Sequence, residues 1–524
     1  MNAQPPRTII ECYEPATRRP LGAVPVDDPD EVRATIARAR AAQAAWGERP
    51  VRDRLRVLER ILAHVLDHAD ELCQVITRDA GKTREHAMLG EIWPVCEKLR
   101  WTLANAERYL APEPVSSGLL VHKRARIEYR PLGVVGVICP WNYPLQNVLG
   151  PTITALAAGN AAVVKVSEWV AWSGARIQAI FDEALLAEGV SPDLVHLVHG
   201  YGETGAALVS GGVDVVVFTG SVGNGRRVIA ESSKTVTPVV AELGGKDAMI
   251  VCDDADLDQA LHALLAGVFI NAGQNCLSSE RILVHEAIYD RFEAMVVEAV
   301  RALRVGPPEG EVDVGAIISP LQVDVIERLV QGSVAAGARA LVGGARVLED
   351  TGQFFAPTVL AEVTPEMPIF REETFGPVVA LVRFRDDAHA IAMANGTEFG
   401  LSSTVFSRDA ARARRIGDRM IAGSTLINDF GLTYMVQELP FGGAKASGFG
   451  RLNGRAGLHA MCNVKSVVED RVPLHQPNRL FPVRAGDYET YAATIQAVYR
   501  TGLGERARSV RSLIGAWWRN GKTA

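Results

Sequence analysis

The 524-residue chain lacks several features that mark specialised classes of protein. Its seven cysteines form no CxxC pair and no metal-ligand spacing, so we predict no metal site and expect a reducing compartment. No apolar run is long enough to span a bilayer, and the first residues lack the apolar core of a signal peptide, so we expect a cytoplasmic protein. A net charge of −6, with dispersed basic residues, gives no general attraction for nucleic acid.

The composition, 48% hydrophobic and 22% charged, is typical of a soluble globular protein. The length exceeds what one ordinary core accommodates and predicts two or three domains. Apolar strands alternate with helical segments from Gly133 to Phe218, and a second alternation of strands and helices begins after Glu242. This alternation indicates two domains, each with a parallel sheet and crossover helices, and we expect the chemistry at their junction.

Cys276 and Glu242 supply a thiol and a carboxylate. A lone cysteine is more often a small buried hydrophobe, but the Gly-Gln-Asn at 273–275 brings flexible backbone and hydrogen-bond donors beside this thiol. The glycines at 244–245 predict that Glu242 lies on a flexible turn. A thiol can attack an aldehyde, a hydride can leave to a nicotinamide, and a base can activate the water that cuts the resulting thioester. The two residues therefore indicate covalent catalysis on a carbonyl.

A third candidate is Asn142, in the loop Pro-Trp-Asn-Tyr-Pro at 140–144 that follows an apolar β-branched run. Ligands of α/β enzymes lie at the ends of parallel strands, and a side-chain amide there can donate to a developing oxyanion, with the Cys276 amide as second donor. The alternative is that Trp141 and Tyr143 only fill a core beside a turn. Cys139, within the apolar run, is expected to be buried.

The segment 215–218 is expected to be a strand, and a glycine-rich turn at 219–226 follows it. Such a turn leading into a helix presents free N–H groups and the positive end of the helix dipole to a phosphate. The order of glycines is not the G-x-G-x-x-G of an ordinary dinucleotide fold, and a simple packing turn is an equal alternative.

Six motifs in combination carry a resemblance to a known family. They are PWNYP at 140–144, FTGS at 218–221, ELGGK at 242–246, GQNC at 273–276, EETFGP at 372–377 and PFGGAKASG at 440–448. On these motifs the chain resembles the aldehyde dehydrogenase superfamily from near residue 20 to about residue 472. The resemblance implies that Cys276 is the nucleophile, that Glu242 is the general base for deacylation, and that Asn142 forms the oxyanion hole with the Cys276 amide.

The resemblance also implies a nicotinamide cofactor. Its contacts are expected at the pyrophosphate, the adenosine ribose and the nicotinamide, through Trp141, Lys165, Glu168, Gly220, Ser221, Gly225, Leu243, Glu373 and Phe375. Lys165 and Glu168 match the pair that binds the adenosine ribose in relatives, although they also fit an exposed charged strand end. Because a carboxylate near the 2′ position repels an added phosphate, we predict NAD, with NADP as the alternative.

The implied fold is α/β and aldehyde dehydrogenase-like, with two Rossmann-like α/β domains and a β arm for oligomerisation. We expect an NAD-binding domain at 1–117 and 133–241, with part of 445–460, and a catalytic domain at 242–444. The arm is expected at 118–132 and 461–472, where alternating polar and apolar residues predict a sheet edge that needs a partner. We therefore predict a homodimer or homotetramer.

The extension at 475–524 departs from the common family pattern. Tyr488, Tyr491, Ile495 and Val498 recur at near-helical spacing, and a second helix would gather Val510, Leu513, Ile514 and Trp517 between basic residues. Basic flanks and tryptophan fit a helix in a membrane interface. We favour the alternative, in which the extension packs on its own or a neighbouring subunit.

We predict NAD-dependent oxidation of an aldehyde to the carboxylic acid through a cysteine thiohemiacetal and thioester. Residues near Trp93, Asn147, Asn275, Leu277 and Phe430 are expected to line the substrate tunnel, and their neutrality favours an apolar aliphatic or aromatic aldehyde. One alternative is a CoA-acylating semialdehyde dehydrogenase, but such relatives generally lack the glutamate at position 242. Another is a non-catalytic NAD-binding or structural relative, against which the intact catalytic residues argue.

Overall fold

The computed structural model describes residues 8–471 and 481–521, which form two compact units. The larger unit comprises residues 8–113 and 126–467, and the smaller comprises residues 114–125 and the described residues from 468 onward. Within these described ranges, no helix combines the length and apolar character needed to cross a membrane. Residues 1–7 of the predicted NAD-binding domain, residue 472 of the predicted arm, and residues 475–480 and 522–524 of the predicted extension lie outside the described residues.

The first sheet of the larger unit has six strands, and all but the edge strand β19 run parallel to their neighbours. In spatial order they are β19 (Gly448–Phe449), β9 (Val239–Leu243), β8 (Val215–Gly220), β5 (Val134–Ile138), β6 (Ala161–Lys165) and β7 (Val195–Val198). Strands β5, β6 and β8 read as nearly continuous valine-rich runs because helices cover both faces of a parallel sheet.

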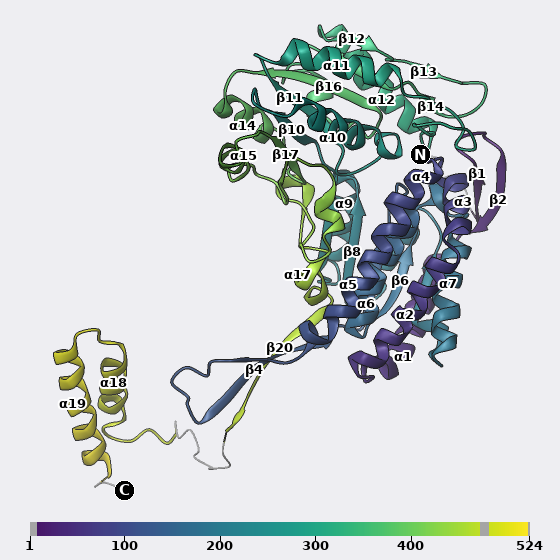
Figure 1. The fold of residues 1–524 in the computed structure, drawn as a ribbon. Coiled ribbons are helices and arrows are strands. Elements are labelled where there is room, and N and C mark those ends of the chain that lie inside the picture. The colour runs from purple at the N-terminus through teal and green to yellow at the C-terminus, as the bar shows by residue number, and fades with distance from the viewer. Residues whose placement is uncertain (1–7, 472–480, 522–524) are drawn as a thin grey trace, which may run out of the picture. The chain divides into compact units, whose positions relative to one another are not determined.

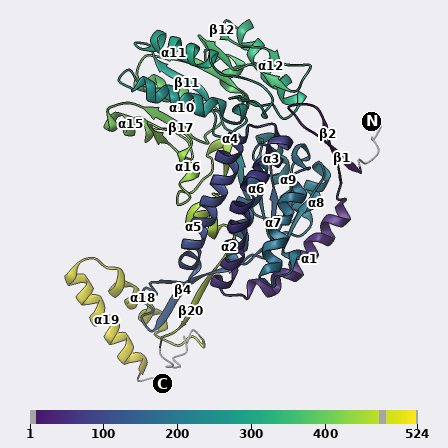
Figure 2. The same ribbon diagram turned by 45° about the vertical axis from the view of Figure 1, so that its right-hand side comes forward.

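The helices of this half pack around the sheet, as Figures 1 and 2 show. They are α1 (Pro29–Gly47), α2 (Val51–Asp67), α3 (Ala69–Ala80), α4 (Arg84–Ala87), α5 (Trp93–Leu110), α6 (Pro144–Ala158), α7 (Gly174–Ala187), α8 (Gly202–Ser210), α9 (Val222–Ser232) and α17 (Gly454–His459). Helices α2 and α3 are separated only by His68. A π-helical turn, Met88–Ile92, links α4 to α5.

The second sheet has seven strands, and only the edge strand β12 is antiparallel to its neighbour. In spatial order they are β12 (Arg339–Val342), β15 (Thr358–Ala361), β16 (Val378–Phe384), β11 (Ser279–His285), β10 (Asp247–Val251), β17 (Ser403–Phe406) and β18 (Leu426–Ile427). Its helices are α10 (Leu257–Phe269), α11 (Tyr289–Arg301), α12 (Pro320–Ala335), α13 (Pro368–Arg371), α14 (Asp387–Asn395), α15 (Ala410–Gly417) and α16 (Leu432–Met435).

Each large sheet has its own hydrophobic core. The core of the first sheet includes Val135, Val163 and Val217, and that of the second includes Ile250 and Leu283, all of them almost fully buried. Parallel strands joined through helices, with a separate core for each sheet, confirm the predicted pair of Rossmann-like α/β domains.

Three smaller sheets complete the described structure. Two are antiparallel pairs, β1 (Ile9–Tyr13) with β2 (Pro20–Pro25) and β13 (Arg346–Val347) with β14 (Phe354–Phe355). The third has the order β20 (Cys462–Asp470), β4 (Lys123–Pro131) and β3 (Glu113–Val115). In the smaller unit, α18 (Asp487–Tyr499) and α19 (Leu503–Gly521) pack against each other.

Candidate active site

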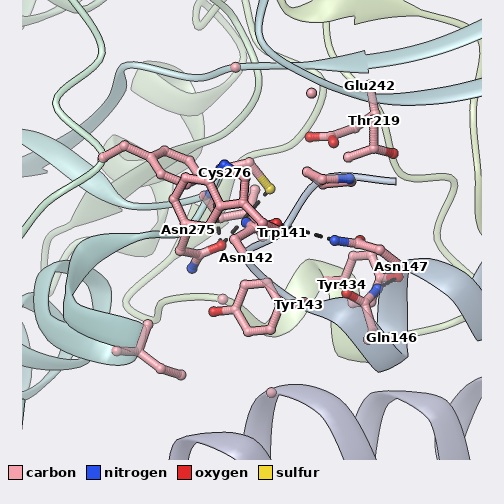
Figure 3. Close-up of a pocket in the computed structure, with 18 of the residues that line it drawn as sticks. Trp141, Asn142, Tyr143, Gln146, Asn147, Thr219, Glu242, Asn275, Cys276 and Tyr434 are labelled. Atoms are coloured by element: carbon pink, nitrogen blue, oxygen red, sulfur yellow. Dashed lines mark hydrogen bonds between the residues drawn. The ribbon is translucent and has the colours of Figure 1, made fainter. Parts of the chain in front are cut away.

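A cavity of about 450 Å³ in the larger unit collects residues from loops of both large sheets. Nine of the predicted site residues line it: Trp141, Asn142, Gly220, Ser221, Glu242, Leu243, Cys276, Glu373 and Phe375. The other three, Lys165, Glu168 and Gly225, are not part of its lining. Figure 3 shows Asn142, Glu242 and Cys276 around the same space, although they lie far apart along the chain.

Cys276 lies in a turn between the short 3-10 helix Ile270–Gly273 and strand β11. Asn271 and Ala272 both have left-handed backbone, with φ of 52° and 55°, and such strained segments are common at functional sites. The loop at Gly245 approaches closely, since a Cβ there would lie 2.5 Å from the carbonyl oxygen of Cys276. Burial and the nearby Glu242 carboxylate raise the pKa of the Cys276 thiol well above its usual value, so formation of a thiolate needs a proton acceptor.

Glu242 is such an acceptor. It lies within strand β9, paired in register with Thr219 of β8 and Gly448 of β19. The prediction that it lies on a flexible turn is therefore wrong, because the turn begins only after Leu243, where β9 ends. Its side chain is buried, and Oε1 has no hydrogen-bond partner among the described residues. Burial raises the pKa of Glu242 to about 7, opposed by the neighbouring thiol, which leaves the carboxyl poised to take up or release a proton near neutrality.

Asn142 is held on both sides of its amide group. Its Nδ2 donates to the carbonyl oxygen of Gln274 at 3.3 Å, and its Oδ1 accepts from Asn147 Nδ2 at 3.2 Å. An amide nitrogen carries two protons, so one remains for an oxygen placed in the cavity beside Cys276.

The backbone of Asn142 is fixed by a buried ion pair that sequence reasoning missed. Lys82 Nζ donates to the carbonyl oxygen of Asn142 at 2.6 Å and to Glu91 Oε1 at 2.7 Å. Both side chains of the pair are completely buried, and Glu91 Oε2 accepts from the backbone N–H of Gln146 at 2.9 Å. The pair thus joins the segment before α5 to Asn142 and to the first turn of α6.

A second contact to the Asn142 carbonyl comes from Asn271, whose Nδ2 donates to it at 2.9 Å. The backbone N–H of Asn271 in turn donates to His86 Nδ1 at 3.2 Å. Because an accepting nitrogen must be unprotonated, this bond requires neutral His86, and burial lowers the pKa of His86 to about 4. Close packing of the same segment leaves no room at Gly90, where a Cβ would lie 2.6 Å from Cε1 of Tyr143.

The glycine-rich turn after β8 leads into α9, as predicted for a phosphate site. Ser221 caps the helix, with its Oγ accepting from the N–H of Asn224 at 3.3 Å, and the first turn of α9 holds no acidic residue. Gly225 is buried and packs against Leu243, where a Cβ would lie 2.6 Å from Cδ2. The positive end of the helix dipole therefore meets the cavity at Ser221 without a competing carboxylate, which fits a pyrophosphate.

Lys165 and Glu168, which are predicted to bind the adenosine ribose, form an ion pair with each other. Lys165, the last residue of β6, lies with its Nζ 3.2 Å from Oε2 of Glu168, at the start of the 3-10 turn Glu168–Val170. Lys165 is buried, whereas the Glu168 carboxylate is about one-third exposed.

The residues predicted to contact the nicotinamide, Glu373 and Phe375, are partly buried and lie beside a buried polar network. Glu373 Oε1 accepts from the N–H of Gly245 at 3.0 Å, and burial, together with the nearby Glu280 carboxylate, raises the pKa of Glu373 to about 8. Glu280 accepts from the N–H of Phe375 at 2.8 Å and pairs with Lys246. The Phe375 ring lies 5.3 Å from that of Trp141, edge to face. These contacts place Glu373 and Phe375 on the cavity wall.

Comparison with known proteins gives one consistent family. The model of the aldehyde dehydrogenase family matches residues 1–467. The 4,4'-diapolycopene aldehyde oxidase of a Methylomonas species is 38% identical over 94% of this chain and 92% of its own length. The succinate semialdehyde dehydrogenase [NAD(P)+] of Escherichia coli is 34% identical over 89% of this chain and 99% of its own.

A solved structure of an aldehyde dehydrogenase from Bacillus cereus in complex with NAD+ superposes with a TM-score of 0.84 at 31% identity, covering 88% of this chain and 94% of that one. The family match spans both Rossmann-like domains and every residue of the cavity. The chain therefore belongs to the aldehyde dehydrogenase family and is an oxidoreductase that acts on aldehydes.

Proposed function

We propose that the protein oxidises an apolar aldehyde to the carboxylic acid with NAD, through a covalent intermediate on Cys276. The observation that carries this proposal is the grouping of Cys276, Glu242 and Asn142 around one cavity. They provide a nucleophile, a base whose pKa is about 7 and a hydrogen-bond donor for an oxyanion.

In the first step Glu242 or water takes the proton of the Cys276 thiol, and the sulfur attacks the aldehyde carbon. The carbonyl oxygen becomes an oxyanion, which the free proton of Asn142 Nδ2 and the Cys276 amide stabilise in the thiohemiacetal. Loss of hydride from carbon then leaves a thioester, and NAD supplies the hydride acceptor when bound. The proton taken from the thiol passes to solvent, and Glu242 then removes a proton from water, which attacks the thioester carbon and releases the carboxylic acid. The proton held by Glu242 returns to the sulfur and restores the thiol.

The residues that would hold the cofactor form two groups. Ser221 and Gly220, at the start of α9, are proposed to receive the pyrophosphate near Trp141, while Lys165 and Glu168 bind the adenosine ribose. Glu373 and Phe375 are proposed to hold the nicotinamide end, with Leu243 and Gly225 shaping the wall between. NAD is preferred over NADP because a 2′-phosphate would approach the Glu168 carboxylate. On this assignment residues 1–117 and 133–241, with part of 445–460, form the NAD-binding domain. The catalytic domain, residues 242–444, carries the thiol and the residues at the nicotinamide end.

The residues that line the cavity favour an apolar substrate. Its only charged residues are Glu242 and Glu373, and no lysine or arginine among the described residues lines it. Four of the five predicted tunnel residues, Asn147, Asn275, Leu277 and Phe430, belong to the lining. Trp93 does not belong to it and is 53% exposed, while Leu89 and Pro94, on either side of it in sequence, do.

A substrate with a carboxylate would therefore find no cation to offset its desolvation. Of the relatives compared, the Methylomonas protein is named for an apolar polyene aldehyde, whereas the Escherichia coli protein is named for a semialdehyde that carries a carboxylate. The cavity favours the first kind of substrate. We also propose a homo-oligomer, in which the edge of the β20-β4-β3 sheet is paired.

The test is NADH formation by the purified chain with long aliphatic, aromatic and semialdehyde substrates, each repeated with NADP. Cys276→Ala is the matched control, because it removes the thiol and keeps the cavity. We expect the highest kcat/KM with a neutral apolar aldehyde and NAD, and no turnover without the thiol. Preference for a carboxylate-bearing semialdehyde would contradict the substrate proposal, and turnover by Cys276→Ala would contradict the covalent one.

A further inference from the structure

The C-terminal hairpin, formed by α18 and α19 with the connection at 500–502, packs through small side chains. The most buried residues of the two helices are Ala493 and Ala497 on α18 and Ser509 and Ala516 on α19, each less than 9% exposed. No large apolar side chain described in the hairpin is buried to the same degree.

Most of the large apolar side chains described in the hairpin instead lie outward along two helical stripes, whereas Val498 and Leu513 are partly buried. On α18 the stripe is Tyr488, Tyr491, Ile495 and Tyr499, and on α19 it is Leu503, Val510, Ile514 and Trp518. These residues are between 41% and 87% exposed, with Leu503 and Tyr488 the most accessible. Spacings of three, four and seven residues place each set on one face of its helix.

Small side chains between the helices and large apolar side chains outside are the reverse of the arrangement that is stable in water. A hairpin that is stable in water places its large apolar side chains between the helices, because burying them supplies most of the free energy of packing. Small residues between helices and large apolar residues outside are typical of helices that meet an apolar phase. Exposed apolar surface of this extent marks an interaction site.

The charge of the hairpin indicates which apolar phase its stripes contact. The hairpin and its lead-in, residues 481–521, contain six arginines and three acidic residues, a net charge of +3, whereas the whole chain carries −6. Arg500 pairs with Glu505 at 3.0 Å, but Arg508 and Arg511 make no ion pair within the described part of the chain. Helical spacing puts Arg511 at the edge of the α19 stripe, seven positions before Trp518. Apolar stripes with tyrosine and tryptophan, edged by arginine, are complementary to an anionic lipid surface.

We propose that the C-terminal hairpin binds the surface of an anionic phospholipid bilayer, with the two apolar stripes in the boundary between headgroups and acyl chains. Neither helix is long and apolar enough to cross the bilayer, so the hairpin lies in the interface. The outward stripes thus reverse the preference that the sequence alone gave to packing against protein. The proposal stands apart from the aldehyde chemistry and requires no property of the active site.

The test is co-sedimentation of the full-length chain with vesicles of phosphatidylcholine alone or mixed with phosphatidylserine. We expect binding to the mixed vesicles that weakens as salt is raised. The double variant Arg508→Gln/Arg511→Gln should partition about 25-fold less, at about fivefold for each arginine near an anionic surface. The matched control is Arg291→Gln/Arg414→Gln, which removes the same charge from exposed positions of the larger unit and should bind as the wild type does.

A third variant, Ile514→Ser, keeps the charge and should also lose binding, and thermal melting of each variant shows whether the chain is folded. A wild-type chain that stays in the supernatant with mixed vesicles would overturn the proposal. Equal losses of vesicle binding in the hairpin variant and in the Arg291→Gln/Arg414→Gln control would overturn it too, because the effect would then come from net charge. If the hairpin variants bind vesicles as the wild type does but dissociate an oligomer in sedimentation velocity, the stripes cover a second copy of the chain and the lipid proposal is wrong.

Discussion

Lys82 Nζ lies 2.6 Å from the backbone carbonyl oxygen of Asn142, although the two residues are 60 positions apart in the chain. The same ammonium group is paired with Glu91, which also binds the N–H of Gln146. A fully buried ion pair therefore fixes the loop that carries the proposed oxyanion donor. We infer that Lys82 and Glu91 are positioning residues, which act through Asn142 without touching the substrate.

Replacing Lys82 tests this role. Lys82→Met leaves Glu91 buried without its partner and should lower the free energy of unfolding by about 3–5 kcal/mol. It should also lower kcat by about 100-fold, because a displaced Asn142 amide no longer donates a hydrogen bond to the oxyanion. The measurements are chemical denaturation and steady-state kinetics.

The control is Lys82→Met/Glu91→Gln, which removes both charges and keeps an amide oxygen for the N–H of Gln146. Its stability should recover, while kcat stays low and the affinity for NAD stays near that of the wild type. Recovery of kcat together with stability would show that the pair is only structural.

Replacing Glu242 should separate formation of the thioester from its hydrolysis. Glu242→Gln keeps the size of the side chain but cannot accept a proton, so hydrolysis of the thioester should slow by about 10²–10⁴-fold. Stopped-flow absorbance should show a burst of about one NADH per active site followed by slow turnover, because water can still accept the proton of the Cys276 thiol in this variant. A normal steady-state rate would mean that another group activates the water.

The pH dependence of hydrolysis should follow the same carboxyl group. Burial raises the pKa of Glu242 to about 7, so the fraction in the base form falls as the pH drops below that value. When deacylation limits turnover, kcat should fall about tenfold per pH unit below 7. The slow rate of Glu242→Gln should lack this inflection, and an unchanged inflection in that variant would assign the titration elsewhere.

Cofactor choice should depend on Glu168. Its carboxylate pairs with Lys165, and a 2′-phosphate near it would meet a like charge. Glu168→Gln should raise kcat/KM for NADP relative to that for NAD by about tenfold, measured as NADPH and NADH formation. Glu349→Gln serves as the control, because it removes an exposed carboxylate that does not line the cavity. An unaltered ratio in Glu168→Gln would mean that the ribose binds elsewhere.

The sequence predicted the features that depend on local pattern. Valine-rich runs gave the parallel strands β5, β6 and β8, and the glycine-rich turn gave the start of α9 at Ser221. Nine predicted site residues meet in the cavity because motifs at the ends of strands in an α/β fold converge in space.

The features that the sequence did not predict depend on long-range packing. The contacts of Lys82, His86 and Glu91 with the Asn142 and Asn271 loops join segments up to 185 positions apart, and no local pattern reports them. Glu242 was expected on a turn because glycines follow it, but pairing of β9 with both β8 and β19 extends the strand through it. Tertiary hydrogen bonding thus outweighed the local preference.

The central claim is that the substrate becomes covalently bound to Cys276, and intact-protein mass spectrometry tests it most directly. Glu242→Gln is mixed with NAD and a neutral apolar aldehyde, quenched in acid and weighed. We predict a mass increase equal to the aldehyde less two hydrogen atoms, as a thioester requires, located at Cys276 by peptide mapping and absent from Glu242→Gln/Cys276→Ala. NADH formation without any adduct on Cys276, or an adduct that persists in the double variant, would contradict the account.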